Sequence, residues 1–99
     1  MNTSIEITRS EDDSKGRYEA RVTGRDGRGE LTYSRVSATS VIADHTGVDE
    51  GLRGTGVGQA LVERFVADAR GEGFTIFPLC PFVKAQYQRH PEWSDVMQA

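Results

Sequence analysis

A glycine-rich loop that runs directly into an amphipathic helix constrains the fold of this chain more than any other feature. The loop occupies residues 53–58, with the sequence Arg-Gly-Thr-Gly-Val-Gly, and the predicted helix continues to Gly71. Gly71 and Gly73 are both suited to end this helix in left-handed conformations. Apolar residues within it recur at the spacing of one buried helix face: Leu61, Val62, Phe65, Val66 and Ala69. The other elements must therefore bury this face.

The start of this helix is suited to binding a phosphate through backbone groups. Its first N–H groups have no partner within the helix and lie at the positive end of the helix dipole. Glycines at positions 54, 56 and 58 would let the backbone approach phosphate oxygens where a Cβ would obstruct them. Three glycines can also simply form a turn, and Arg53 can either bind a phosphate or only order the loop.

Two common phosphate-binding motifs do not fit this loop. A P-loop has Lys-Ser or Lys-Thr after its last glycine, whereas Gly58 is followed by Gln59 and Ala60. A dinucleotide-binding fingerprint is Gly-x-Gly-x-x-Gly after the first strand of a parallel unit. Here the spacing is Gly-x-Gly-x-Gly, and the preceding residues show no alternation of strands and helices.

The chain before the loop predicts an antiparallel meander of four strands, at residues 5–9, 18–22, 31–36 and 40–46. Asp26-Gly27 is a favoured hairpin turn between the second and third strands. After the helix, residues 74–78 predict a fifth strand that is parallel to the fourth or splayed from it, because a helix separates the two. A last helix begins at Pro81 or Phe82 and ends near His90. The expected class is α+β, a mixed sheet in a single domain over residues 1–99.

Composition excludes several classes of function. The net charge is −3 and basic residues are scattered among acidic ones, so no electrostatic footprint for nucleic acid or an anionic membrane is present. The sequence has no apolar run of membrane-spanning length and no signal-peptide pattern. One cysteine and two histidines without paired spacing predict no ordinary zinc site, so we expect no metal. We expect a cytoplasmic protein.

Several motifs together resemble one family. Arg53-Gly54-Thr55-Gly56-Val57-Gly58 matches Arg/Gln-x-x-Gly-x-Gly/Ala, and residues 48–58 align with Val-x-Pro-x-x-Arg-Gly-x-Gly-x-Gly, with Glu50 in place of proline. The segment from Phe74 to Trp93 carries Pro-Leu-Cys-Pro-Phe-Val and His-Pro-Glu-Trp. In these motifs the chain resembles the GNAT superfamily of acyl-CoA N-acyltransferases, and in particular its short YjdJ-type branch.

The resemblance implies a minimal GNAT core, without the two helices that full-length members insert after their first strand. It also implies an N-acetyltransferase that transfers acetyl from acetyl-CoA to an amine of an unidentified acceptor. Because the absent helices usually help to form the acceptor site, the alternative is an acetyl-CoA-binding module or sensor with little turnover. By the same resemblance, the loop binds the CoA pyrophosphate and the end of the fourth strand pairs with the pantetheine arm. The implied cofactor-binding residues are Thr46, Gly47, Val48, Arg53, Gly54, Thr55, Gly56, Val57, Gly58 and Gln59.

The candidate catalytic residues are Cys80, His45 and Tyr87. In the superfamily's Asn-x-x-Ala-x-x-x-Tyr pattern Cys80 takes the Asn position and Tyr87 the Tyr, so Tyr87 either protonates the departing CoA thiolate or is a core aromatic. Cys80 could carry the acetyl group as a nucleophile, contact the thioester, or be an inert buried thiol.

A general base is expected on the fourth strand, where Asp44 and His45 stand. Because strand neighbours point to opposite faces, only one of the two can serve as the base. His45 is favoured for its near-neutral titration and could work with Cys80; the alternative is a structural, hydrogen-bonded histidine. His90 is expected to cap the last helix and Trp93 to cover the core.

Overall fold

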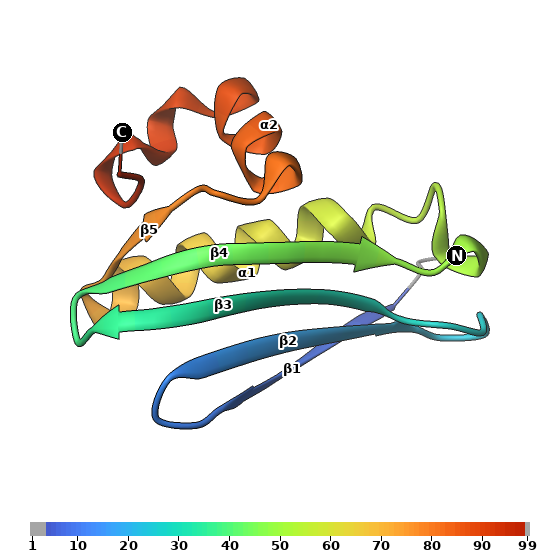
Figure 1. Cartoon of the computed structure of the whole chain (residues 1–99). Coiled ribbons are helices and arrows are strands. Elements are labelled where there is room, and N and C mark those ends of the chain that lie inside the picture. Colours follow the sequence, from blue (N-terminus) through green and yellow to red (C-terminus); the bar gives the residue numbers. More distant parts are fainter. Residues whose placement is uncertain (1–3, 99) are drawn as a thin grey trace.

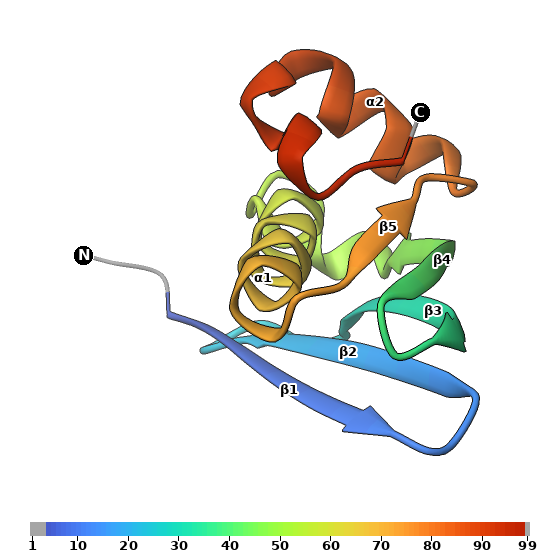
Figure 2. The same cartoon turned by 90° about the vertical axis from the view of Figure 1, so that its left-hand side faces the viewer.

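The computed structural model describes residues 4–98, which form a twisted sheet with one long helix packed on one of its faces (Figures 1 and 2). The sheet has five strands in the order β1-β2-β3-β4-β5. This confirms the predicted mixed α+β fold. The strands are β1 (Ile5–Glu11), β2 (Lys15–Val22), β3 (Gly29–Ser37), β4 (Ser40–Val48) and β5 (Thr75–Phe77).

The first four strands form the predicted antiparallel meander, and β5 is parallel to β4. Strands β1 to β4 extend beyond the predicted bounds because their pairing continues up to the turns. Strand β5 is shorter than predicted, since it pairs with β4 only from Ser40–Thr75 to Ile42–Phe77. On its other side β5 forms a single bridge between Ile76 and Met97. The fifth strand therefore leaves β4 early, as the splayed arrangement requires.

The long helix α1 (Val57–Glu72) begins two residues before the predicted start, so Val57 and Gly58 belong to its first turn. Gly56 precedes it with φ 83°, and Gly73 ends it with φ 79°. Gly71 lies inside the helix, so its predicted left-handed role is wrong. One glycine in this conformation is sufficient to close the helix, and Gly73 donates its N–H to the carbonyl of Ala69.

The core lies between α1 and the inner face of the sheet. All five predicted core positions of α1 are at most 2% exposed. The ring of Phe65 stacks on Tyr33 at a centroid distance of 5.1 Å and lies 5.6 Å from Tyr18. Gly29 on β3 allows α1 to come this close, because a Cβ there would lie 2.4 Å from Cγ1 of Val57. The position of the helix start is thus fixed by packing.

Strand β4 contains a bulge where it pairs with β3. Tyr33 pairs with Ala43, but the next residue toward the start of β3, Thr32, pairs with His45. Asp44 is therefore an extra residue on β4. A bulge of this kind changes which of the following side chains face the core.

Helix α2 (Pro81–Arg89) packs against β4 and α1, and two short 3-10 helices, η1 (Glu50–Leu52) and η2 (Pro91–Asp95), complete the fold. Trp93 is buried, as predicted, and its ring stacks on that of His90 at 4.3 Å. His90 follows α2, and its backbone N–H donates to the carbonyl of Tyr87. Within residues 4–98, no helix is both long and apolar enough to cross a membrane. No described helix lies on the outer face of the sheet, the face opposite α1 (Figure 2).

Candidate functional site

The glycine loop is held by its own turns and leaves two glycines facing open space. Gly54 and Gly56 have φ of 80° and 83°, a conformation that favours glycine. Apart from chain neighbours, no atom of the described residues would lie within 4 Å of a Cβ at either position. The Thr55 hydroxyl donates to the carbonyl of Leu52 at 2.5 Å, and Leu52 is buried. The buried leucine thus anchors a loop whose outer side is open.

Backbone donors are free where the loop enters α1. The first intrahelical bond runs from the Ala60 N–H to the Gly56 carbonyl, so the N–H groups of residues 56–59 have no acceptor within the helix. Among the described residues no side chain caps this end, and the first turn carries no acidic residue. These N–H groups can therefore donate hydrogen bonds to an anion without displacing a protein group.

Gly58 serves a different purpose from the other two loop glycines. A Cβ at this position would lie 2.7 Å from Cζ of Phe82, the second residue of α2. The absence of a side chain at Gly58 therefore lets the two helices approach each other, whereas the predicted reason was access for phosphate. Gln59, next in the chain, is exposed and its side-chain amide donates to Glu63.

Arg53 stands at the start of the loop with its side chain exposed. In the described part of the chain, no carboxylate lies within ion-pair distance of its guanidinium. Its charge is thus available to a ligand. Val57, in contrast, points into the core and is 1% exposed, so it can offer a ligand only its backbone.

The second part of the site is the split between β4 and β5. After Ile42–Phe77 the two strands no longer pair, and the N–H of Cys80 donates to the carbonyl of Ala43 at 2.9 Å. Beyond this bond, residues 44–48 of β4 have no strand partner on that side among residues 4–98. Thr46, Gly47 and Val48 lie on this edge, where an extended ligand could add as a further strand.

Cys80 lies at this split, between β5 and α2. It is 3% exposed and immediately precedes α2, whose first residue is Pro81. Its side chain does not cap the helix; Sγ lies 3.4 Å from the hydroxyl oxygen of Thr46. The structure thus brings Cys80 together with Thr46, a pairing that the sequence analysis missed.

The bulge in β4 corrects the prediction that Asp44 and His45 face opposite sides. Asp44 accepts a 2.6 Å hydrogen bond from Ser34, and His45 is exposed opposite Thr32, so both lie on the outer face. Thr46 pairs with Leu31, which is 0% exposed, and so faces inward. No hydrogen bond within residues 4–98 joins His45 to Cys80. The signal was in the sequence: Val41 and Ala43 occupy odd positions, whereas the next inward apolar residue, Val48, is even.

Tyr87 lies on α2, half-buried against the core. It is seven residues after Cys80, which places it about 10 Å further along the helix axis. Helical side chains lean toward the N-terminus, so the phenol of Tyr87 leans back toward the end of α2 that carries Cys80. This placement suits the predicted role and also suits a core aromatic.

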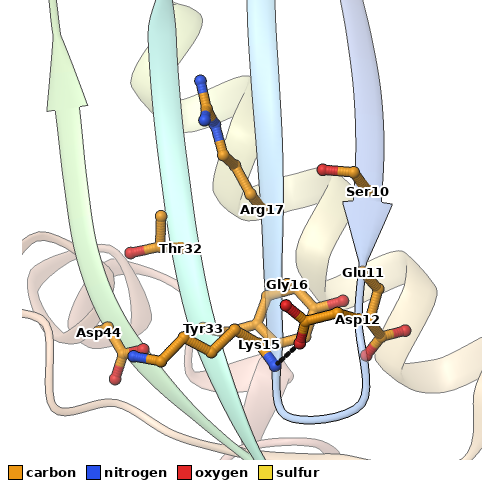
Figure 3. A pocket seen from close by; sticks show the side chains of 9 residues that line it. All are labelled: Ser10, Glu11, Asp12, Lys15, Gly16, Arg17, Thr32, Tyr33 and Asp44. Atoms are coloured by element: carbon orange, nitrogen blue, oxygen red, sulfur yellow. Dashed lines mark hydrogen bonds between the residues drawn. The ribbon is translucent and has the colours of Figure 1, made fainter.

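The outer face of the sheet carries a hollow of about 590 Å³ (Figure 3). The side chain of Lys15 extends across β3 toward Asp44 within it. None of its lining residues belongs to the glycine loop, and Cys80 is not among them. A second hollow of about 320 Å³ is lined by His45, Gly47 and Val48 together with Arg28, Glu30 and Asp49. No group of three His, Cys, Asp or Glu residues in the described ranges is arranged to hold a metal ion.

Comparison with known proteins agrees with this fold. The model of the GCN5-related N-acetyltransferase family matches residues 17–96. The fold is similar to the NMR solution structure of a protein from Staphylococcus aureus described as a GCN5-like putative N-acetyltransferase, with a TM-score of 0.65 and 28% sequence identity. The similarity covers 95% of this chain and 88% of that one. Among curated proteins none matches. The family match spans most of the chain, which therefore belongs to the GCN5-related N-acetyltransferases.

Proposed function

We propose that the protein binds acetyl-CoA and transfers its acetyl group to an amine of an acceptor that remains to be identified. The observation that carries the proposal is the open start of α1. Two left-handed glycines, Gly54 and Gly56, lead into a helix whose first N–H groups are free and face no carboxylate of its own first turn. Such an end binds an anion through backbone alone, and the CoA pyrophosphate is the anion that the family uses.

The rest of the cofactor would follow the free edge of β4. In this arrangement the N–H groups of residues 56–59 hold the pyrophosphate and Arg53 adds charge, while Gly54 and Thr55 shape the loop. The pantetheine arm pairs with the backbone of Thr46, Gly47 and Val48, where β5 has left the sheet. The thioester then reaches the split beside Cys80.

The chemistry would proceed in two acyl-transfer steps. The Cys80 thiolate attacks the thioester carbonyl carbon; a bond from Sγ to the acetyl group forms, and the bond to the CoA sulfur breaks. The departing CoA thiolate takes a proton from the Tyr87 hydroxyl. A neutral amine that approaches from the outer face then attacks the carbonyl carbon of acetyl-Cys80; the amide bond forms, the bond to Sγ breaks and Cys80 leaves as the thiolate. The proton lost by the amine nitrogen is taken up by His45, and exchange with solvent carries a proton from His45 back to the Tyr87 phenolate.

The alternative is an acetyl-CoA-binding module or sensor with little turnover. One observation favours it: β1 and β2 are joined by residues 12–14 alone, and no described helix covers the outer face, where an acceptor would bind. Incubation with labelled acetyl-CoA and a panel of polyamines and lysine peptides separates the two. Labelled product supports transfer, and tight binding without product supports the module.

Calorimetric titration with acetyl-CoA tests the binding site itself. In Gly56→Asn the new residue tolerates the left-handed conformation, but its side chain occupies the open space in front of the first N–H groups of α1. Gly24→Asn is the matched control, since Gly24 also has φ 80° and open space, but lies in the turn after β2. We expect Gly56→Asn to weaken acetyl-CoA binding more than about tenfold, because one or two charge-assisted hydrogen bonds would be lost. The control should bind as the wild type does; equal binding by all three proteins would refute the site.

The covalent step has its own test. Mass spectrometry of the protein after brief incubation with acetyl-CoA should show one acetyl group on Cys80, and none on Cys80→Ala. Since Cys80 is the single cysteine, a thioester adduct can only be there. Turnover by Cys80→Ala at the wild-type rate would mean that the amine attacks acetyl-CoA directly.

A further inference from the structure

We propose that Thr46 is a positioning residue whose hydroxyl donates a hydrogen bond to the thiolate of Cys80; the inference rests on the acetyl transfer proposed above. The hydroxyl oxygen lies 3.4 Å from Sγ, within the range for a hydrogen bond to sulfur. Among the described residues, the Thr46 hydroxyl is the side-chain group that forms a hydrogen bond with this thiol. Cys80 is 3% exposed, so little water can replace the contact.

The bulge in β4 selects Thr46 for this position. Ala43 faces the core, and regular alternation would place His45 next on the same side. The extra residue, Asp44, reverses the phase, so His45 pairs with Thr32 on the outer face and Thr46 takes the inward position. A neutral hydroxyl therefore takes the inward position that an unbroken alternation from Ala43 would give to an imidazole.

The backbone fixes the cysteine on both sides of its side chain. Its N–H donates to the carbonyl of Ala43 at 2.9 Å, and its carbonyl accepts from the N–H of Lys84 at 3.0 Å. The thiol is thereby held at the N-terminal end of α2, where the helix dipole favours a negative charge. The Thr46 hydroxyl adds a directed donor, because a hydroxyl can rotate to give its hydrogen to a thiolate.

Ionisable groups on the neighbouring elements do not take this role. On β4, Asp44 and His45 lie on the outer face. On α2, Lys84 is exposed and Tyr87 lies further along the helix. The part of α1 nearest to α2 presents Gly58 to Phe82. Thr46 is thus the group through which β4 can act on the sulfur.

The experiment uses the single cysteine. Protein labelled with carbon-13 at Cβ of cysteine gives one resonance, whose shift reports thiolate formation as the pH rises. In Thr46→Val, which keeps the branched shape without the hydroxyl, the midpoint should rise by about one pH unit, as expected for loss of a hydrogen bond to a charged group. In Thr46→Ser the hydroxyl remains, and the midpoint should stay within a few tenths of a unit of the wild type.

Two results would overturn the inference: the same midpoint in Thr46→Val and wild type, or a rise in Thr46→Ser as large as in Thr46→Val. Amide spectra establish that each variant is folded, and Thr46→Ala replaces Thr46→Val if valine does not fit. The titration needs no acetyl-CoA, so it is independent of the proposed function. A Thr46-dependent midpoint without an acetyl adduct on Cys80 would count against the covalent step alone.

Discussion

At the residue scale, Tyr18 shows how one polar group joins the sheet to the helix. Its ring is 0% exposed, and its hydroxyl donates to Oδ2 of Asp68 on α1 at 2.6 Å. The guanidinium of Arg9 on β1 lies 5.5 Å from the same ring and pairs with Asp68 at 3.3 Å. Burial first, and then the hydrogen bond to Asp68, raise the pKa of Tyr18 above its ordinary value.

This pKa shift predicts a pH dependence of stability. A group whose pKa is higher in the folded state stabilises the protein fully below its unfolded pKa, about 10 for tyrosine, and loses this contribution as the pH rises further. The free energy of unfolding of the wild type should therefore fall relative to Tyr18→Phe above about pH 10, by up to about 1.4 kcal/mol per pH unit. Urea denaturation of both proteins between about pH 8 and 11 measures the difference. A constant difference over this range would show that the hydroxyl is not held as described.

Individual site residues could be predicted from the sequence where the backbone alone defines the role. The open, left-handed Gly54 and Gly56 fit the loop that the motif predicted. The contact of Thr46 with Cys80 could not be predicted, because it depends on a bulge and on where α2 begins relative to β4. The packing reason for a glycine at position 58 could not be predicted either, because its neighbour Phe82 belongs to a different helix.

At the element scale, a glycine beneath the helix sets the distance between α1 and the sheet. Gly29 lies under the first turns of α1, and a Cβ there would lie 2.4 Å from Val57 and 3.2 Å from Leu61. Both residues are at most 1% exposed, so an added methyl group would press on side chains of the core. The start of the helix, and with it the free N–H groups of the loop, rests on this contact.

Replacing Gly29 with alanine should therefore destabilise the fold by about 1–3 kcal/mol through overpacking. The control is Gly71→Ala, the same change at an exposed site inside α1 where the new Cβ meets no described atom within 4 Å. There we expect a gain of roughly 0.5–1 kcal/mol, because alanine is the better helix former. Chemical denaturation measures both; equal and small effects would mean that helix and sheet are more loosely packed than described.

Element types followed from the sequence more readily than their exact partners. Alternation and the turn glycines predicted the meander, and the apolar spacing predicted the buried face of α1. The apolar positions of β4 indicate that the alternation changes phase between Ala43 and Val48, but they do not locate the extra residue, so Asp44 and His45 were predicted to face opposite sides. The bridge from Ile76 to Met97 depends on packing of the C-terminal segment that has no local signal.

At the scale of the whole molecule, the fold places two open features side by side and leaves one sheet face bare. The start of α1 lies against α2 where Gly58 meets Phe82, and the free edge of β4 contacts Cys80, the residue before α2, through Thr46. The outer face, with its hollow beside Asp44, has no described helix over it. This division suits a cofactor bound on the α2 side and an acceptor that approaches from the sheet face.

The most direct test of the account is a titration of nitrogen-15-labelled protein with CoA, followed through its backbone amide resonances. If the start of α1 holds the pyrophosphate, the largest shifts will fall on the amides of Gly56, Val57, Gly58 and Gln59, with a second group at Thr46 and Val48. Saturable binding that leaves the amides of residues 56–59 unmoved, or shifts confined to the outer face of the sheet, would contradict it.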